Sequence, residues 1–412
     1  MTERPLVAYG AVTAAYWAFM LSDGALRMLV LLHFHILGFS PVQLAYLFLL
    51  YELAGIITNY SAGWIATRFG LTRTLYAGLG LQIAALLALA MLDPGWAIGA
   101  SLVYVMVVQG VSGVAKDLAK MASKSAVKLL APAEGDGLFR WVAALTGSKN
   151  AVKGLGFLLG SGLLATLGFG PAVLAMAAVL AAILVGVLIG MPDGLPAGRK
   201  GPRLREVWSL DPDINRLALA RLFLFGARDV WFVVGIPVYF YAVLSDGTAE
   251  GNRAAFFLIG GFMALWIILY GAVQAAAPQV LRAGRRPASA LVAEARRWAL
   301  RLTFIPAALA LLAWLAGDPA PWLTAALIAG LLLFGAVFAI NSALHSWLIL
   351  DFAQDVRVSM DVGFYYMANA AGRLLGTLLS GLSYQWGGLS LCLATAAALL
   401  GLSTISAARL RD

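Results

Sequence analysis

GPAVLAMAAVLAAILVGVLIG, at 170–190, is an uninterrupted apolar stretch without a charged side chain. A helix needs about 20 apolar residues to cross the hydrocarbon core of a bilayer. Backbone groups cannot stay unpaired in lipid, so a stretch of this kind must be helical. Strands of a membrane barrel would be about ten residues long with alternating polarity. The stretch therefore predicts a transmembrane helix.

The whole chain has the composition of a membrane protein. Of its 412 residues, 62% are hydrophobic and 12% are charged, about half the roughly 25% charged residues of an average soluble domain. This balance excludes a soluble globular protein and a disordered one. One cysteine excludes a disulfide framework and a multi-cysteine metal site, and three histidines leave little for a metal centre. We expect no cofactor and no metal.

Eleven other stretches are also long and apolar enough to cross a bilayer. The twelve predicted spans are 7–32, 41–66, 72–92, 96–118, 138–167, 170–190, 214–243, 254–277, 298–316, 321–341, 360–385 and 387–407. The first span carries Asp23 and Arg27 and has no convincing cleavage site, so it is not a cleaved signal peptide. The predicted fold class is an all-α polytopic membrane protein with twelve transmembrane helices in two six-helix halves.

Positive charge is distributed unevenly between the two sets of loops. Of the 29 Lys and Arg residues, twenty fall in one set of loops and termini, and only Arg253 falls in the opposite set. By the positive-inside rule, the first set and both termini are cytoplasmic. We expect a multi-pass protein of the inner (cytoplasmic) membrane. The net charge of +9 then needs no nucleic acid partner.

A polar stretch rich in Pro, Gly and Arg divides the chain. It covers 191–213 and reads as a cytoplasmic linker between an N-terminal six-helix half, 1–190, and a C-terminal half, 214–412. The halves resemble weak repeats. Segment 19–34 can be set against 225–240, which places Asp23 opposite Asp229, and 150–163 can be set against 369–382. Two such halves are a transporter layout.

The sequence GWIATRFGLTR at 63–73 resembles the loop signature of the major facilitator superfamily. Gly63, Arg68, Gly70 and Arg73 match that signature, and Thr67 stands where an acidic residue is usual. With twelve spans and a central linker, the resemblance implies an alternating-access transporter. The four matching residues are then the predicted gating loop.

Several charged side chains fall near the middle of predicted spans, where a charge costs several kcal/mol unless it is paired or faces water. Asp23 and Arg27 are four residues apart on one helical face and could form a local salt bridge. Lys149 and Lys153 put two like charges on one face, and the basic residues at these depths outnumber the acids. One interpretation is a set of structural ion pairs. The other is a cationic cavity for a multiply charged anion, since Arg binds phosphate or carboxylate through two parallel hydrogen bonds.

The candidate residues follow from the second interpretation. The predicted substrate-binding residues, drawn from both halves, are Arg27, Lys149, Lys153, Arg228, Arg373, Tyr270 and Asn369. The predicted coupling residues are the acids Asp23, Asp229 and Glu52. Zinc-protease, phosphate-loop and nucleophile-elbow motifs are missing from the sequence, so we predict a protein that is not an enzyme.

Five longer runs carry a closer resemblance. They are AYWAFMLSDGALRMLVLLHFHILGFSP (15–41), GVAKDLAKMASKSAVKLLAP (113–132), WVAALTGSKNAVKGLGFLLG (141–160), RLFLFGARDVWFVVGIPVYF (221–240) and DVGFYYMANAAGRLLGTLLSG (361–381). Together they resemble the organoarsenical efflux permeases of the major facilitator superfamily, the ArsJ type.

This resemblance implies a substrate and a functional partner. The substrate would be 1-arseno-3-phosphoglycerate, which a glyceraldehyde-3-phosphate dehydrogenase makes when arsenate replaces phosphate. Its export, driven by an ion gradient, would give arsenate resistance. We expect a monomer in the lipid bilayer. Alternatives are a transporter of the same fold for another organophosphate or a drug, and a polytopic receptor or scaffold that transports nothing.

Overall fold

The computed structural model describes residues 3–130, 137–190, 209, 211–281, 288–353 and 358–410. Within these ranges the regular secondary structure is entirely helical. The helices are α1 (Glu3–Ile36), α2 (Pro41–Tyr46), α3 (Leu49–Phe69), α4 (Leu71–Ala90), α5 (Ile98–Leu130), α6 (Gly137–Leu167), α7 (Phe169–Gly190), α8 (Pro212–Val230), η2 (Trp231–Gly235), α9 (Ile236–Leu244), α10 (Ala249–Leu281), α11 (Ala288–Ala316), α12 (Pro321–Phe352) and α13 (Val358–Ala408).

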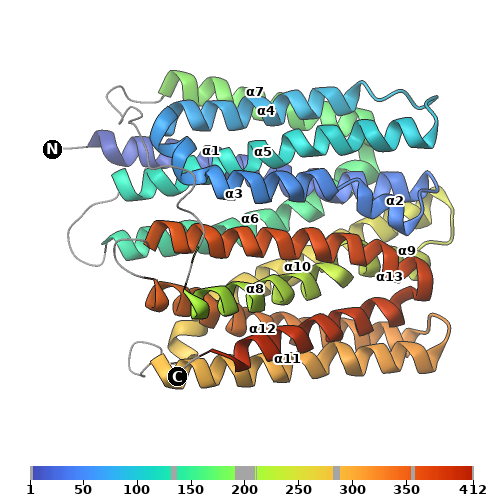
Figure 1. Cartoon of the computed structure of the whole chain (residues 1–412). Helices are drawn as coiled ribbons and strands as arrows, with labels where there is room; N and C mark the ends of the chain where they lie inside the picture. Colours follow the sequence, from blue (N-terminus) through green and yellow to red (C-terminus); the bar gives the residue numbers. More distant parts are fainter. Residues whose placement is uncertain are drawn as a thin grey trace.

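The helices form one elongated bundle whose long axes run in a common direction (Figure 1). Helices α1–α7 gather in one part of the bundle and α8–α13 in the other, and both chain ends lie at the same end of the bundle (Figure 1). An even number of crossings predicts this placement of the termini. Most of the predicted linker, 191–208 and residue 210, lies outside the described residues.

Ten helices of the described chain are long and apolar enough to cross a membrane, so the protein is an all-α polytopic membrane protein. The predicted number was twelve. The difference arises at two places. The predicted span 214–243 is divided into α8, η2 and α9, and the last two predicted spans lie together in α13. The count of twelve crossings stays a prediction.

Each of these two places has a local cause. Within α13, Gly387 and Gly388 leave helical geometry, and Gly388 has a φ of 60°, where a Cβ atom would be strained. At η2, a π-helical turn, the side chains of α13 bind backbone groups. Ser380 Oγ accepts hydrogen bonds from the Val234 and Gly235 amides, at 3.1 and 3.3 Å. Turns of this kind are frequent at functional sites.

Several helices extend beyond their predicted spans. Helix α11 starts at Ala288, ten residues before the predicted 298, and α12 continues to Phe352 instead of ending at 341. Hydropathy marks only the part of a helix that lies in hydrocarbon, whereas backbone hydrogen bonding continues into the aqueous layer. The predicted ranges were therefore too short at these ends.

Small residues allow two helix pairs to approach closely. A Cβ atom on Gly156 of α6 would lie 2.4 Å from the Leu21 carbonyl oxygen of α1. In the other half, a Cβ atom on Gly372 of α13 would lie 2.1 Å from the Leu222 carbonyl oxygen of α8. Gly156 lies in the repeat segment 150–163 and Gly372 in 369–382, and small residues are typical where membrane helices approach closely.

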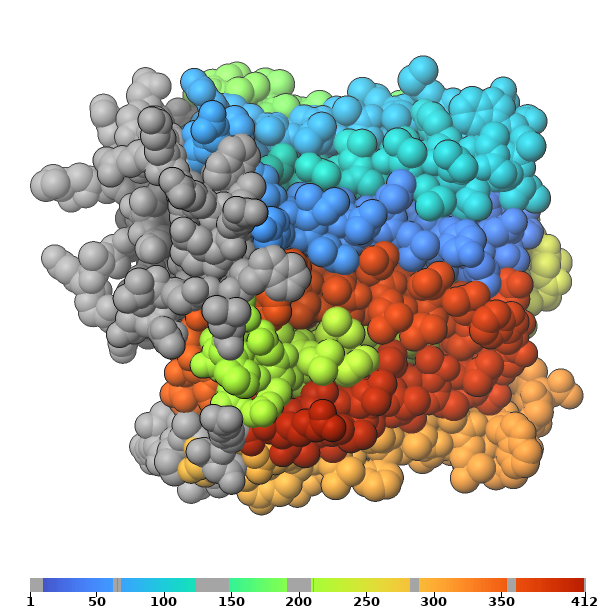
Figure 2. Space-filling model, in the orientation of Figure 1, coloured from blue at the N-terminus to red at the C-terminus, as the bar shows by residue number. Residues whose placement is uncertain are grey.

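Helix α13 lies at the boundary of the two groups of helices. On the face drawn in Figure 2, its surface separates α3 from α8. The amino-terminal part of α13, before Gly387, is therefore the element through which a side chain can reach both groups.

Candidate functional site

The charged centre of the C-terminal half lies at the end of α8. Asp229 there accepts hydrogen bonds from two guanidinium groups. Its Oδ1 is 2.5 Å from Arg228 Nη2, and its Oδ2 is 3.3 Å from Nε of Arg373 on α13. Asp229 is buried, as is the ring of Phe225, over which the Arg228 guanidinium lies at 4.8 Å. Two cations thus share one carboxylate.

Glu52 of α3 connects this centre to the N-terminal half. Its Oε1 lies 2.6 Å from Arg373 Nη2 and 3.3 Å from both terminal nitrogens of Arg27 on α1. Glu52 is buried. One carboxylate therefore holds an arginine from each half, and Arg373 bridges two carboxylates that belong to different halves.

The N-terminal half contains a third carboxylate, Asp23 on α1. Lys153 of α6 donates to its Oδ2 at 2.6 Å, and the Tyr51 hydroxyl donates to its Oδ1. The Lys116 ammonium lies 4.0 Å from the centre of the Tyr51 ring, a cation–π distance. In each half an aspartate is therefore bound by a cation of a neighbouring helix, Asp23 of α1 by Lys153 of α6 and Asp229 of α8 by Arg373 of α13.

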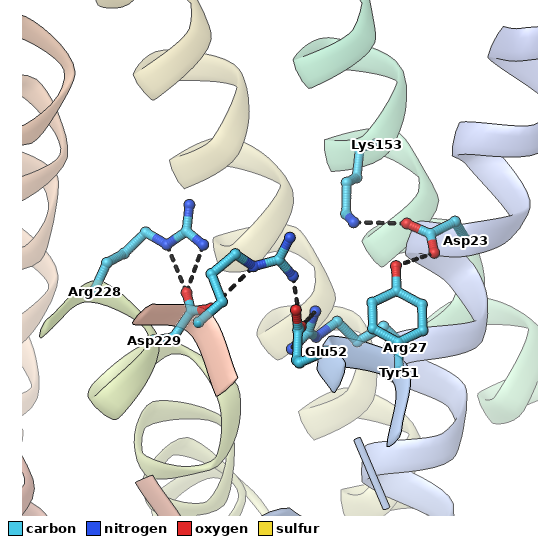
Figure 3. A network of polar contacts seen from close by, with 8 residues as sticks. Asp23, Arg27, Tyr51, Glu52, Lys153, Arg228 and Asp229 are labelled. Carbon is cyan, nitrogen blue, oxygen red and sulfur yellow. Dashed lines mark hydrogen bonds and ion pairs between the residues drawn. The ribbon is translucent and has the colours of Figure 1, made fainter. Parts of the chain in front are cut away.

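These contacts form a line of alternating charge across the middle of the bundle. Figure 3 shows Arg228 and Asp229 on one side, Glu52 with Arg27 in the centre, and Lys153, Asp23 and Tyr51 on the other side. Side chains from α1, α3, α6, α8 and α13 take part. We call this set, which also includes Arg373, the central ion network.

In the central ion network, the basic side chains are more exposed than the acidic ones. The side chains of Asp23, Glu52 and Asp229 are 1 to 2% exposed. The side chains of its four cations retain more accessible surface, from 11 to 19%; they are Arg27, Lys153, Arg228 and Arg373. The accessible surface of the network therefore belongs mainly to its cations.

The predicted local bridge between Asp23 and Arg27 is wrong. Arg27 reaches across to Glu52, and Asp23 is taken by Lys153. The glycines of α1 and α6 bring those two helices together, so a partner on the neighbouring helix replaces the one a turn away. Spacing along one helix could not reveal this.

The shortage of acids was also expected to leave the cations without carboxylates. Instead Lys153 is paired with Asp23, Arg228 with Asp229, and Arg373 with both Asp229 and Glu52. Glu52 and Asp229 each bind two arginines, so three carboxylates serve four cations. The predicted residues from both halves do come together. They do so as shared ion pairs.

The other predicted binding residues lie around the network. Lys149 is one turn before Lys153 on α6 and is partly exposed. Tyr270 of α10 is buried and stacks on Trp266, with ring centres 5.7 Å apart. Asn369 accepts a hydrogen bond from Nε of Arg221, so it belongs to a separate cluster of the C-terminal half.

The predicted gating loop is a very short connection. Gly70, with a φ of 74°, separates α3 from α4, and Arg68 and Arg73 are exposed on either side of it. Gly63 lies within α3. The positive φ explains the glycine at position 70, since other residues are strained there.

Three residues in or beside the central ion network were not among the predicted site residues. Tyr51 binds Asp23, Lys116 lies against the Tyr51 ring, and Arg221 is buried among neutral acceptors. Lys116 and Arg221 could have been found from their charge and depth in predicted spans. Tyr51 carries no such signal. In the described residues no group of three or more metal-ligating side chains is present.

No family model matches the sequence, and no curated protein matches it. The solved structures do provide a match to the fold. The crystal structure of a POT family transporter in complex with 5-aminolevulinic acid is similar over 96% of this chain and 94% of that chain, with a TM-score of 0.73 and 14% sequence identity. The chain therefore shares the fold of that transporter.

Proposed function

We propose that the protein is a secondary transporter that exports an organic anion across the inner membrane. It crosses the bilayer twelve times, because α8, η2 and α9 follow one another without a loop and α13 is broken at Gly387 and Gly388. Residues 1–190 and 214–412 are the two moving halves, joined by 191–213, and both termini are cytoplasmic. The chain acts as a monomer.

The observation that supports an anionic substrate is the difference in exposure between the cations and the carboxylates of the central ion network. The cations present accessible surface and the carboxylates do not. An oxyanion can therefore approach the guanidinium groups of Arg27, Arg228 and Arg373 and compete with the carboxylates for them. Cationic drugs would meet the wrong sign of charge, which disfavours the alternative of a drug exporter.

The charge balance supports the same conclusion. The cations of the central ion network are Arg27, Lys153, Arg228 and Arg373, and its carboxylates are Asp23, Glu52 and Asp229. The network thus has one more cation than carboxylate, which suits an anionic substrate, since uncompensated buried charge is costly.

The particular substrate we propose is 1-arseno-3-phosphoglycerate, supplied by a glyceraldehyde-3-phosphate dehydrogenase. The resemblance of five segments to organoarsenical efflux permeases supports this choice, and the charge of the network is compatible with it. A molecule with an oxyanion at each end can engage Arg373 and a second cation at once. Other organophosphates share this chemistry and are the alternative substrates.

Release of the anion requires that the carboxylates recapture the cations. Glu52 is suited to this role because it binds Arg27 and Arg373 from opposite halves. Protonation of Glu52, Asp23 or Asp229 would free cations for the substrate, and deprotonation would displace the substrate. The three acids are therefore the proposed coupling residues for an ion gradient.

Uptake into everted membrane vesicles tests the proposal. Vesicles are given glyceraldehyde 3-phosphate, NAD, radiolabelled arsenate and the dehydrogenase, and the arsenic retained inside is measured. We expect time-dependent accumulation that disappears when the dehydrogenase is omitted. Arg296→Gln is a matched control, since Arg296 donates to carbonyl groups at the end of α13, away from the network.

Two outcomes separate the alternatives. Equal uptake of 3-phosphoglycerate or of the phosphate analogue of the substrate would assign a general organophosphate transporter. Failure of every organophosphate to enter, in vesicles that contain the protein at normal levels, would refute the anion transporter.

A further inference from the structure

Arg221 is a buried cation outside the central ion network. It lies on α8, is 4% exposed, and donates from Nε to Asn369 Oδ1 at 3.1 Å. Its Nη1 donates to the carbonyl and hydroxyl oxygens of Ser342 on α12, at 3.0 and 2.9 Å. Within the described ranges these acceptors are all neutral, and none bonds Nη2. The charge of Arg221 is thus solvated by the protein but not neutralised.

Two aromatic rings pack against the Arg221 guanidinium. Its central carbon lies 4.1 Å from the ring centre of Phe225 and 5.1 Å from that of Tyr365, both within cation–π range. The N–H groups of a guanidinium lie in its plane, where an oxyanion can accept paired hydrogen bonds.

Phe225 also connects Arg221 to the central ion network. The guanidinium of Arg228 lies over the same ring, at 4.8 Å. Arg221 and Arg228 are seven residues apart, which places them on one face of α8 at an axial separation of about 10 Å. The two arginines form consecutive cationic positions along the helix.

Helix α12 places two unused polar side chains beside Ser342. Asn341 and His345 are fully buried, and among the described residues neither the Asn341 amide atoms nor the two His345 ring nitrogens have a hydrogen-bond partner. His345 is three residues after Ser342 on α12, so it lies on the same side of the helix as the serine that accepts hydrogen bonds from Arg221. Buried polar groups are nearly always bonded, so two unsatisfied residues next to an uncompensated cation indicate a missing ligand.

We infer that Arg221, Asn341 and His345 form a second oxyanion subsite that binds a tetrahedral phosphate-like group. The arginine supplies charge and in-plane donors, and the amide and the imidazole supply neutral donors. The group can be free inorganic phosphate or the terminal phosphate of an organic substrate. The role of this subsite as a holding point along the transport path rests on the proposed function, but its existence does not.

Histidine ring NMR can test the subsite directly because the chain has only three histidines. His33 and His35 are in the last turn of α1, far along the chain from His345 on α12. Purified protein with labelled histidine is titrated with sodium phosphate against sodium chloride of equal ionic strength, and His345→Asn assigns the signal. We expect a saturable shift of the His345 ring signals and none for the other two.

Matched variants locate the ligand. Arg221→Gln should weaken the phosphate affinity read at His345 at least tenfold, and Arg221→Lys should weaken it less. Arg228→Gln removes the neighbouring cation and should leave the phosphate-dependent shift of the His345 ring signals unchanged. Unchanged His33 and His35 signals show that each variant is folded. A titration with glycerol 3-phosphate separates the two sources. A higher affinity than for inorganic phosphate assigns the subsite to a phosphate ester, and no shift of the His345 signals assigns it to free phosphate.

The subsite is overturned if phosphate leaves His345 unshifted in the parent protein, or if the shift survives in Arg221→Gln. This result is distinguishable from failure of the proposed function. A His345 shift in a protein that exports no organophosphate retains the subsite and refutes the exporter. Export of an organophosphate without any shift of the His345 signals retains the exporter and refutes the subsite.

Discussion

The two halves of the bundle hold an aspartate at matching positions but neutralise it differently. Asp23 is bound by one ammonium group and one neutral hydroxyl, from Lys153 and Tyr51. Asp229 is bound by two guanidinium groups, from Arg228 and Arg373. The N-terminal centre is therefore balanced locally, whereas the C-terminal centre carries surplus positive charge.

Glu52 makes this difference a property of the whole molecule. It belongs to the N-terminal half, yet it accepts the hydrogen bond that Arg373 donates from the C-terminal half. The N-terminal half thus supplies the acid that the other half lacks. Under the proposed function, the two halves share one anion site, to which the C-terminal half contributes Arg228 and Arg373 and the N-terminal half contributes Glu52, the carboxylate that competes with the anion for Arg373.

Neutralising the two corresponding cations should give the largest effect. Arg373→Gln removes the partner of both Asp229 and Glu52, and we expect vesicle uptake to fall at least 100-fold, roughly 2.8 kcal/mol of binding and transition-state free energy. Lys153→Gln removes the partner of Asp23 alone and should cost about tenfold, or ~1.4 kcal/mol. Initial uptake rates at equal membrane protein levels measure both. Equal losses would show that the two halves are functionally equivalent.

Exchanging lysine and arginine should have a smaller and one-sided effect. Arg373→Lys keeps the charge but cannot reach two carboxylates through a planar group, so we expect uptake to drop about tenfold. Lys153→Arg keeps the single contact with Asp23 and should change uptake less than about twofold. The same rates, measured over a range of substrate concentrations, test this. Full uptake activity of Arg373→Lys would mean that the planar guanidinium of Arg373 is not needed for transport and that the residue has a structural role only.

Removing each aspartate charge should separate coupling from packing. Asp229→Asn frees two arginines permanently, so export by this variant should lose its stimulation by an imposed proton gradient. Asp23→Asn frees one lysine and should retain at least half of the stimulation. If both variants respond fully to the gradient, neither aspartate carries the coupling proton. The proton is then carried by Glu52 or by the histidines of α1, or export is coupled to counter-transport of phosphate instead.

The smallest effect should follow from the neutral partner of Asp23. Tyr51→Phe removes one hydroxyl hydrogen bond, a contribution of about 1 kcal/mol to stability, and should reduce uptake about twofold. Tyr104→Phe is the control, because its hydroxyl donates to the Ala88 carbonyl oxygen outside the network. Thermal unfolding should change similarly in both variants, and uptake only in the first. Reduced uptake in both would mean that stability alone is responsible.

Much of the fold could be predicted from apolar stretches, because lipid forces such stretches to be helical. The predicted boundary near residue 386 coincides with the break at Gly387 and Gly388. The π-helical turn η2 could not be predicted, since its amides bind Ser380, which is distant in the sequence. Long-range contacts of this kind leave no periodic pattern.

The candidate site was predictable in its members but not in its pairing. Charge at mid-span depth identified Arg27, Lys153, Arg228 and Arg373. The repeat comparison matched Asp23 with Asp229. The partner of each charge depends on which helices pack together, so the bridge from Arg27 to Glu52 could not be derived from spacing along one helix.

The most direct test of the central claim is a double-mutant cycle between the halves. If Lys153 and Arg373 act on one anion, their effects on uptake of the dehydrogenase product must be coupled. Uptake rates are compared for Lys153→Gln, Arg373→Gln and the double variant. We predict that the double variant is hardly worse than Arg373→Gln, a coupling of more than about 1 kcal/mol. Losses that add to within about 0.5 kcal/mol would contradict a single anion site shared by the two halves.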